Sequence, residues 1–155
     1  MQYKYYLHLF AGMAMLELGN LASSLAPFNV SAVSESLGAN SQESGLVVTL
    51  ELFFAAISSL FFGTVSYKGK ALAYCGSLIV ICSYFLCSIA SDVNQITFIK
   101  AFSGIGCGML IASGHSILAS SQDPNRSYAL FTLFASLTAA FLIYISSTWI
   151  EDGGH

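Results

Sequence analysis

Apolar residues fill five long stretches of the chain, and polar segments separate them. The stretches cover residues 5–26, 46–66, 71–90, 97–119 and 128–149. Each has about 20 mostly apolar residues, the length at which a helix crosses a hydrocarbon core about 30 Å thick. The pattern predicts an all-α, polytopic membrane protein whose five transmembrane helices form a single membrane domain over residues 1–155.

The separators carry the turn-forming and charged residues. The first reads SAVSESLGANSQESG (residues 31–45), and later ones read YKGK, SDVNQ and SQDPNRS. We interpret all of these segments as loops that do not cross the membrane. Because most of them are short, we expect neighbouring helices to be antiparallel.

The composition supports a membrane protein. Hydrophobic residues make up 55% of the chain and charged residues 8%, whereas a soluble domain carries about 25% charged residues. The net charge is -3, and the five cations are spread along the chain. They form no basic patch, so we expect the lipid bilayer, and no nucleic acid, as a partner.

Charged residues outside the spans divide between alternate separators. The cations there are Lys4, Lys68, Lys70 and Arg126, and the carboxylates of the other separators are Glu35, Glu43, Asp92, Glu151 and Asp152. Cytoplasmic loops carry the excess of Lys and Arg. This distribution predicts a cytoplasmic amino terminus and a carboxyl terminus on the outside of a plasma membrane or cell inner membrane.

Cysteine and histidine positions predict no metal site and no cofactor. All four cysteines lie within predicted spans: Cys75, Cys82, Cys87 and Cys107. They lack the CxxC or Cys/His spacing of metal ligands. Cysteines without this spacing are typically packing residues. His8 and His115 alone are too few to form a metal site.

The first 26 residues also have features of a secretory signal. Lys4 precedes an apolar stretch that ends in SSLAP, with small residues. Glu17 interrupts this stretch, however, and its length suits a full span. We therefore favour a first transmembrane helix.

Three segments carry a resemblance to a known family. The segment after the second span reads GTVSYKGKAL, the fourth span begins IKAFSGIGCG, and the segment ASSQDPNRSYAL follows it. In this order they resemble the amino-terminal half of a major facilitator superfamily transporter. The resemblance covers nearly all of the chain, as helices 1 to 5 of an architecture that normally has twelve.

The family motifs map onto named positions. In the family, the loop between helices 2 and 3 reads approximately G-x-L-a-D-r-x-G-r-k. This chain is similar to that pattern at Gly63, Lys68, Gly69 and Lys70. The family's helix 4 motif reads R-x-x-q-G and is followed by further glycines. This chain is similar to it, with lysine in place of arginine, at Lys100, Ser103, Gly104, Gly106 and Gly108. A proline followed by an arginine after helix 4 is matched by Pro124 and Arg126. Tyr67 replaces the loop aspartate, so the charge contact of that motif is not expected here.

The resemblance implies movement of a small solute by alternating access, driven by an ion gradient or by the solute's own gradient, with secondary active, proton-coupled transport as one form. Such transporters bind substrate between two halves near the bilayer midplane. Five helices supply one wall of that site. We therefore expect the chain to be an incomplete half, inactive alone, whose partner is the missing half or another membrane protein.

Three strongly ionisable side chains lie well inside the predicted spans: Glu17, Glu51 and Lys100. A charge at the bilayer centre costs about 2.5 to 3.5 kcal/mol even on lenient scales, so such residues face protein and often mark function. At 1.5 Å per residue, Lys100 and Glu51 are level, and Glu17 lies about one turn deeper. The resemblance favours Glu17 as the partner of Lys100, because helices 1 and 4 line the family's central cavity, while Glu51 remains the alternative.

The neighbours of these charges on their helices support burial against protein. Lys100 is followed at steps of four by Gly104, Gly108, Ala112 and Ser116, a stripe of small residues that lets another helix approach closely. Glu17 shares its helix face with Asn20 and Ser24. We take Glu17, Asn20, Glu51 and Lys100 as candidates for substrate binding or proton coupling, against a purely structural ion pair.

Two other functions, a hydrolase and a non-transporting membrane protein, compete with transport. Ser113 and His115 suggest a hydrolase, but residues two apart on a helix point away from each other, so no enzymatic activity and no catalytic residue is predicted. The rival from another class is a small, non-transporting membrane protein that packs against a partner within the bilayer.

Overall fold

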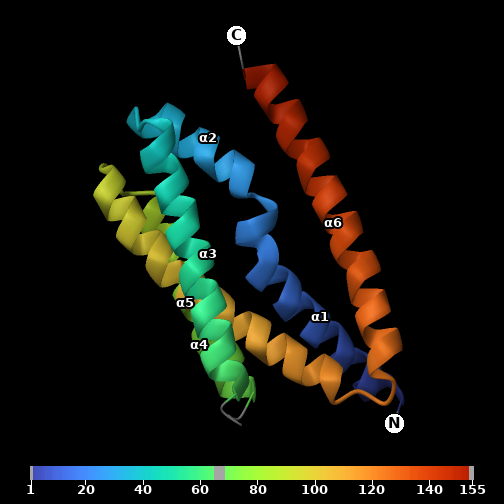
Figure 1. Cartoon of the computed structure of the whole chain (residues 1–155). Helices are drawn as coiled ribbons and strands as arrows, with labels where there is room; N and C mark the ends of the chain where they lie inside the picture. The colour runs from blue at the N-terminus through green and yellow to red at the C-terminus, as the bar shows by residue number, and fades with distance from the viewer. Residues whose placement is uncertain (1, 65–68, 154–155) are drawn as a thin grey trace.

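The computed structural model describes residues 2–64 and 69–153, with side chains at residues 3, 5–64 and 69–145 (Figure 1). All regular structure in these ranges is helical, which confirms the all-α prediction. The helices are α1 (Gln2–Ser24), α2 (Ala26–Leu37), α3 (Ser41–Thr64), α4 (Gly69–Cys87), α5 (Val93–Ala119) and α6 (Pro124–Gly153).

Four of these helices, α3 to α6, are long and apolar enough to cross a membrane. The bent pair of α1 and α2 makes a fifth if it counts as one span. Large apolar side chains such as Leu60, Phe61, Leu78 and Leu137 are more than half exposed. Exposed apolar surface of this extent is typical of a membrane or protein contact.

The segment at residues 31–45 is not the simple connection that its polar residues predicted. Its first part, to Leu37, belongs to α2, which follows α1 at a bend of 50°, and its last part, from Ser41, belongs to α3. Pro27 explains the bend, because a proline has no N–H for the helical ladder and clashes with the preceding turn. The residues beyond it form a helix because Val30, Val33 and Leu37 share one face, and Val33 and Leu37 pack into an apolar cluster with Val47 and Ile96.

The turn between α2 and α3 is stabilised by two local devices. Gly38 ends α2 in the left-handed conformation, at φ 63°, where the lack of a Cβ removes the steric cost. The Asn40 side chain accepts a hydrogen bond from Glu43 N at 2.9 Å, and Asn40 N donates to Glu43 Oε2 at 3.0 Å. This capping box fixes the start of α3.

Helix α5 is the central element of the bundle. It packs against α3, α4 and α1, and in Figure 1 it passes behind α3. Within its most apolar 18 residues 56% are buried, against 28% for α3 and 22% for α4. The other helices are therefore positioned mainly by their contacts with α5.

The seam between α5 and α3 is a backbone contact at glycines. Gly104 lies against the carbonyl oxygen of Glu51, and a Cβ on Gly108 would come within 2.5 Å of the carbonyl oxygen of Ala55. Ser58 Oγ adds a hydrogen bond of 2.8 Å to the carbonyl oxygen of Ile105. The structure thus confirms that the stripe of small residues after Lys100 admits another helix, and identifies that helix as α3.

Other glycines of α5 make close contacts on its other faces. A Cβ on Gly106 would lie 2.9 Å from the carbonyl oxygen of Gly76 in α4, and one on Gly114 would lie 2.7 Å from that of Gly12 in α1. No side chain larger than hydrogen fits at these positions without movement of a backbone. Helix α5 therefore has a close backbone contact with each of three neighbours.

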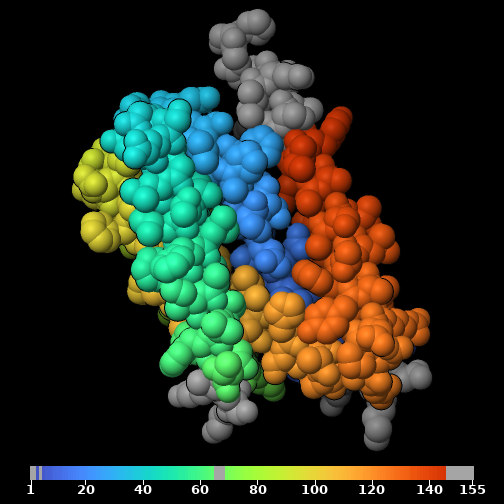
Figure 2. Space-filling model, in the orientation of Figure 1, coloured from blue at the N-terminus to red at the C-terminus, as the bar shows by residue number. Residues whose placement is uncertain are grey.

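Helix α6 contacts the bundle at residues in its first half. Tyr128 Oη lies 3.2 Å from His115 Nδ1, and the rings of Phe10 and Phe134 meet edge to face at 6.2 Å. From Tyr128 to Ile145 no described side chain is buried. Figure 2 shows α6 and α3 on either side of α1, which is visible between them.

Gly108→Ala should destabilise the bundle because the added methyl group would meet the backbone of α3. We expect a loss of about 1–3 kcal/mol in the free energy of unfolding, the usual cost of overpacking. Gly45→Ala is the matched control, because a Cβ there meets nothing within 4 Å. Unfolding of the purified protein in mixed detergent micelles measures both changes, and equal stability of the two variants would contradict the packing assignment.

Candidate functional site

A buried ion pair joins α5 to α3. Lys100 Nζ lies 3.2 Å from Glu51 Oε2 and donates a hydrogen bond of 3.4 Å to Glu51 Oε1. The Glu51 side chain has no exposed surface and that of Lys100 is 7% exposed. Removal of one partner from such a pair leaves an uncompensated buried charge, at a cost of about 3–5 kcal/mol.

Tyr84 of α4 completes the surroundings of the ammonium group. Its ring centroid lies 4.5 Å from Lys100 Nζ, within the range of a cation–π interaction. The Lys100 head group thus contacts side chains from two different helices. It links α3, α4 and α5 at one level of the bundle.

The glycine seam positions this ion pair. Gly104 lies one turn after Lys100, and it contacts the backbone carbonyl of Glu51 itself. Because α3 and α5 approach so closely there, the two side chains meet without spanning a wide gap. The sequence prediction that Lys100 and Glu51 lie at the same level agrees with this contact.

Glu17 is not the partner of Lys100, so the preference drawn from the family resemblance is wrong in this structure. Gly12, Leu16 and Gly19 of α1 lie against α5. At about 100° per residue, Glu17 lies about 140° around the helix from Gly12. The side of α1 that packs on α5 is therefore its glycine side, and the polar strip lies elsewhere.

Glu17 is buried and incompletely bonded. It is 6% exposed, and its Oε2 atom has no hydrogen-bond partner in the described part of the chain. Phe10, seven residues earlier on nearly the same side of α1, contacts Phe134 of α6. Glu17 thus lies on the side of α1 that turns toward α6, and Asn20, one turn on, is half-buried.

The remaining predicted residues fall into two groups. Gly104 and Gly108 are buried packing residues, as expected. Gly63, Lys70 and Arg126 are exposed, and Gly69 is partly exposed at the start of α4. Lys68 lies outside the described residues.

Ser113 and His115 form hydrogen bonds with different partners. The Ser113 hydroxyl donates to the carbonyl oxygen of Met109 at 2.8 Å, while His115 contacts Tyr128. Within the described residues no three His, Cys, Asp or Glu side chains gather as metal ligands, and the four cysteines are free thiols.

Comparison with known proteins finds no matching family model, no matching curated protein and no matching solved structure. The site is therefore assigned from its own geometry.

Sequence reasoning missed two features of this region. Tyr84 was not identified, although its place in an apolar run one helix before Lys100 made it a possible neighbour. The second is a cavity lined by His8 and Lys70 at the end of the bundle where α1 and α4 begin. These two residues are 62 positions apart, and only the packing of both α1 and α4 on α5 brings them to one space.

A double-mutant cycle measures the ion pair. Lys100→Met and Glu51→Leu should each lower the free energy of unfolding by about 3–5 kcal/mol, because each strands a buried charge. The double variant should lose much less free energy of unfolding than the two single variants added together, because both charges are removed at once. Glu17→Gln is the control, for which we expect no such loss because Glu17 is absent from the pair. Additive losses in the double variant would show that the two charges do not stabilise each other.

Proposed function

We propose that this chain is the amino-terminal part of a secondary transporter that moves a small solute across a membrane by alternating access. The observation that carries the proposal is Glu17, a buried carboxyl group with an unpartnered oxygen. It stands on α1, within a stretch long and apolar enough to form part of a span. Ionisable residues in such positions are costly and characteristically serve substrate or proton pathways.

The two charged sites suit different roles. Lys100 and Glu51 satisfy each other within the bundle, with Tyr84 over the ammonium group. That arrangement suits a fixed contact between helices, since Glu51 Oε2, although it accepts no hydrogen bond, lies 3.2 Å from Lys100 Nζ in the ion pair. Glu17 Oε2 has neither a hydrogen bond nor an ion pair among the described residues, which suits a group that changes partner during a transport cycle.

The arrangement of the helices supports the same proposal. Helix α1, with Glu17, is flanked by α3 and α6 (Figure 2), and no described side chain from Tyr128 to Ile145 of α6 is buried. Glu17 is already buried in this chain, and a second group of helices against this face would place it between two halves. Secondary transporters place their binding sites at such an interface near the bilayer midplane.

The exposed face of α6 also favours a second candidate, a non-transporting membrane protein that packs against a partner within the bilayer. The two candidates differ in what Glu17 does. A transporter needs its carboxyl group for solute movement, whereas a packing protein needs only the surface of α6.

The test of transport uses a deletion strain of the source organism, complemented with the wild-type gene or with Glu17→Gln. We expect the deletion to lose uptake of at least one solute from a labelled panel, and the wild type to restore it. Glu17→Gln should reduce that uptake by about tenfold or more at equal protein levels, because it cannot exchange a proton. Unchanged uptake across the panel in the deletion strain, with a cross-linked partner on α6, would favour the packing protein.

We also propose that the amino terminus is cytoplasmic. The described cations Lys70 and Arg126 lie at the end of the bundle where α4 and α6 begin. At the other end, Glu35 and Glu43 lie on either side of the turn between α2 and α3, and Asp92 lies directly before α5. This division follows the rule that Lys and Arg stay inside.

Cysteine labelling in intact cells tests this orientation. In a background with the four native cysteines replaced by serine or alanine, Gln42→Cys should react with a membrane-impermeant maleimide from outside. Asn125→Cys should react only after the cells are opened. Both residues are exposed, so the reversed pattern would mean the opposite orientation.

A further inference from the structure

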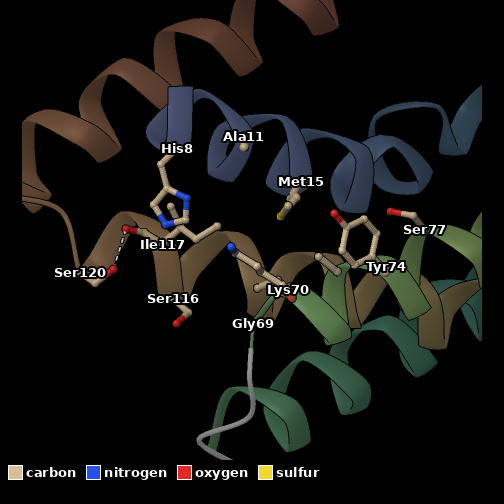
Figure 3. Close-up of a pocket in the computed structure, with 12 residues that line it drawn as sticks. His8, Ala11, Met15, Gly69, Lys70, Tyr74, Ser77, Ser116, Ile117 and Ser120 are labelled. Carbon is tan, nitrogen blue, oxygen red and sulfur yellow. Dashed lines mark hydrogen bonds between the residues drawn. The ribbon is translucent and has the colours of Figure 1, made fainter. Parts of the chain in front are cut away.

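A cavity of about 450 Å³ lies between α1, α4 and α5, at the end of the bundle where α1 and α4 begin. Figure 3 shows His8 reaching into this space from α1, and Lys70 and Tyr74 from α4. Ser77, Ser116 and Ser120 contribute hydroxyl groups to the lining. It lies apart from the Lys100–Glu51 pair, whose residues are not among those that line it.

The polar part of the lining consists of hydrogen-bond donors and one permanent cation. Lys70 carries three N–H donors, an imidazole donates through at least one ring nitrogen, and the hydroxyls of Tyr74, Ser77 and Ser116 can each donate. The hydroxyl of Ser120 already donates to the carbonyl oxygen of Ile117 and can only accept. No carboxylate lines the cavity, and none forms an ion pair with Lys70 among the residues that the structure describes. The positive charge is thus without a counter-charge from these residues.

The start of α4 strengthens this polarity. Helix α4 begins at Gly69, which itself lines the cavity. The amino-terminal end of a helix carries partial positive charge and unpaired N–H groups, which favour an anion. The ammonium group of Lys70 and the helix end therefore act in the same direction.

The rest of the wall is apolar. Ala11, Met15, Ala73 and Ile117 line the cavity beside the polar groups. An anion that carries a hydrocarbon or glycerol portion could place its charge at Lys70 and its apolar part along these side chains. The combination differs from the surroundings of Lys100, where a carboxylate already neutralises the cation.

We propose that this cavity binds a phosphate group, with Lys70 and His8 as its principal contacts. A phosphate monoester or diester offers several acceptor oxygens, which match the convergent donors. The group can come from an anionic phospholipid or from free phosphate. The apolar wall accommodates the lipid, and the two sources are separated by experiment.

The full chain is purified in a neutral detergent, and lipid binding is measured by native mass spectrometry. Phosphatidylglycerol should bind more tightly than phosphatidylcholine, which has the same phosphate but no net charge. Lys70→Ala should weaken phosphatidylglycerol binding by about tenfold, the scale of one charge-assisted contact. Lys70→Arg should restore most of the affinity, and His8→Ala should give a smaller loss.

Arg126→Ala is the matched control, because Arg126 is exposed and does not line the cavity. We expect it to change the affinity by less than about twofold, as for a distant, screened surface charge. An equal loss in Lys70→Ala and Arg126→Ala, or equal binding of the two lipids, would overturn the proposal.

Inorganic phosphate at millimolar concentration then identifies the source. Displacement of the lipid by phosphate, absent in Lys70→Ala, indicates a site for free phosphate. Retention of the lipid indicates a headgroup site. Because these readouts concern binding alone, they succeed or fail independently of transport and of Glu17.

Discussion

The close backbone contact of α5 with its neighbours is the constraint on which the bundle depends. Gly104 and Gly108 bring α5 against α3, Gly106 brings it against α4, and Gly114 brings it against α1. In the bilayer that we propose for this chain, lipid tails are as apolar as leucine, so burial of apolar surface drives helix association weakly. Close packing and interhelical polar contacts provide the attraction instead.

The ion pair follows from this packing. A lysine and a glutamate on facing helices compensate for their desolvation only when their geometry is good. The contact between Gly104 and the backbone of Glu51 supplies that geometry, because it fixes the separation and the register of α3 and α5 one turn from Lys100. The Ser58 hydrogen bond to Ile105 fixes the same register further along the seam. The glycines and the charges therefore act as one unit.

What the sequence could predict depended on information carried within a single helix. The apolar stretches located the long helices, and the spacing of Gly104 and Gly108 from Lys100 predicted a close helix contact, both in agreement with the structure. The depth of Lys100 and Glu51 along their helices kept Glu51 as an alternative partner. These inferences needed only the helical period and the rise per residue.

The inferences that failed depended on how two helices are rotated relative to each other, or on the balance of polar and apolar residues in one short segment. Whether Glu17 meets Lys100 depends on which side of α1 turns toward α5, and the glycine side of α1 does so because it permits closer packing. Helix α2 was missed because its polar residues suggested a connection, whereas Val33 and Leu37 gain burial only once α3 and α5 are beside them.

The contrast between the charged sites then carries a physical argument about function. The Lys100 ammonium group has a carboxylate and an aromatic ring within contact distance, so a change in its environment would cost the energy of both. Glu17 Oε2 has no hydrogen-bond partner among the described residues, and exposed Lys70 forms no ion pair with them. A site that must bind and release a ligand cannot have its charge fully satisfied by the protein, because the ligand would then have to replace an equally good partner. If the proposed function holds, Glu17 of α1 and the cavity at Lys70 of α4, rather than the Lys100–Glu51 pair, are therefore the places for ligand exchange.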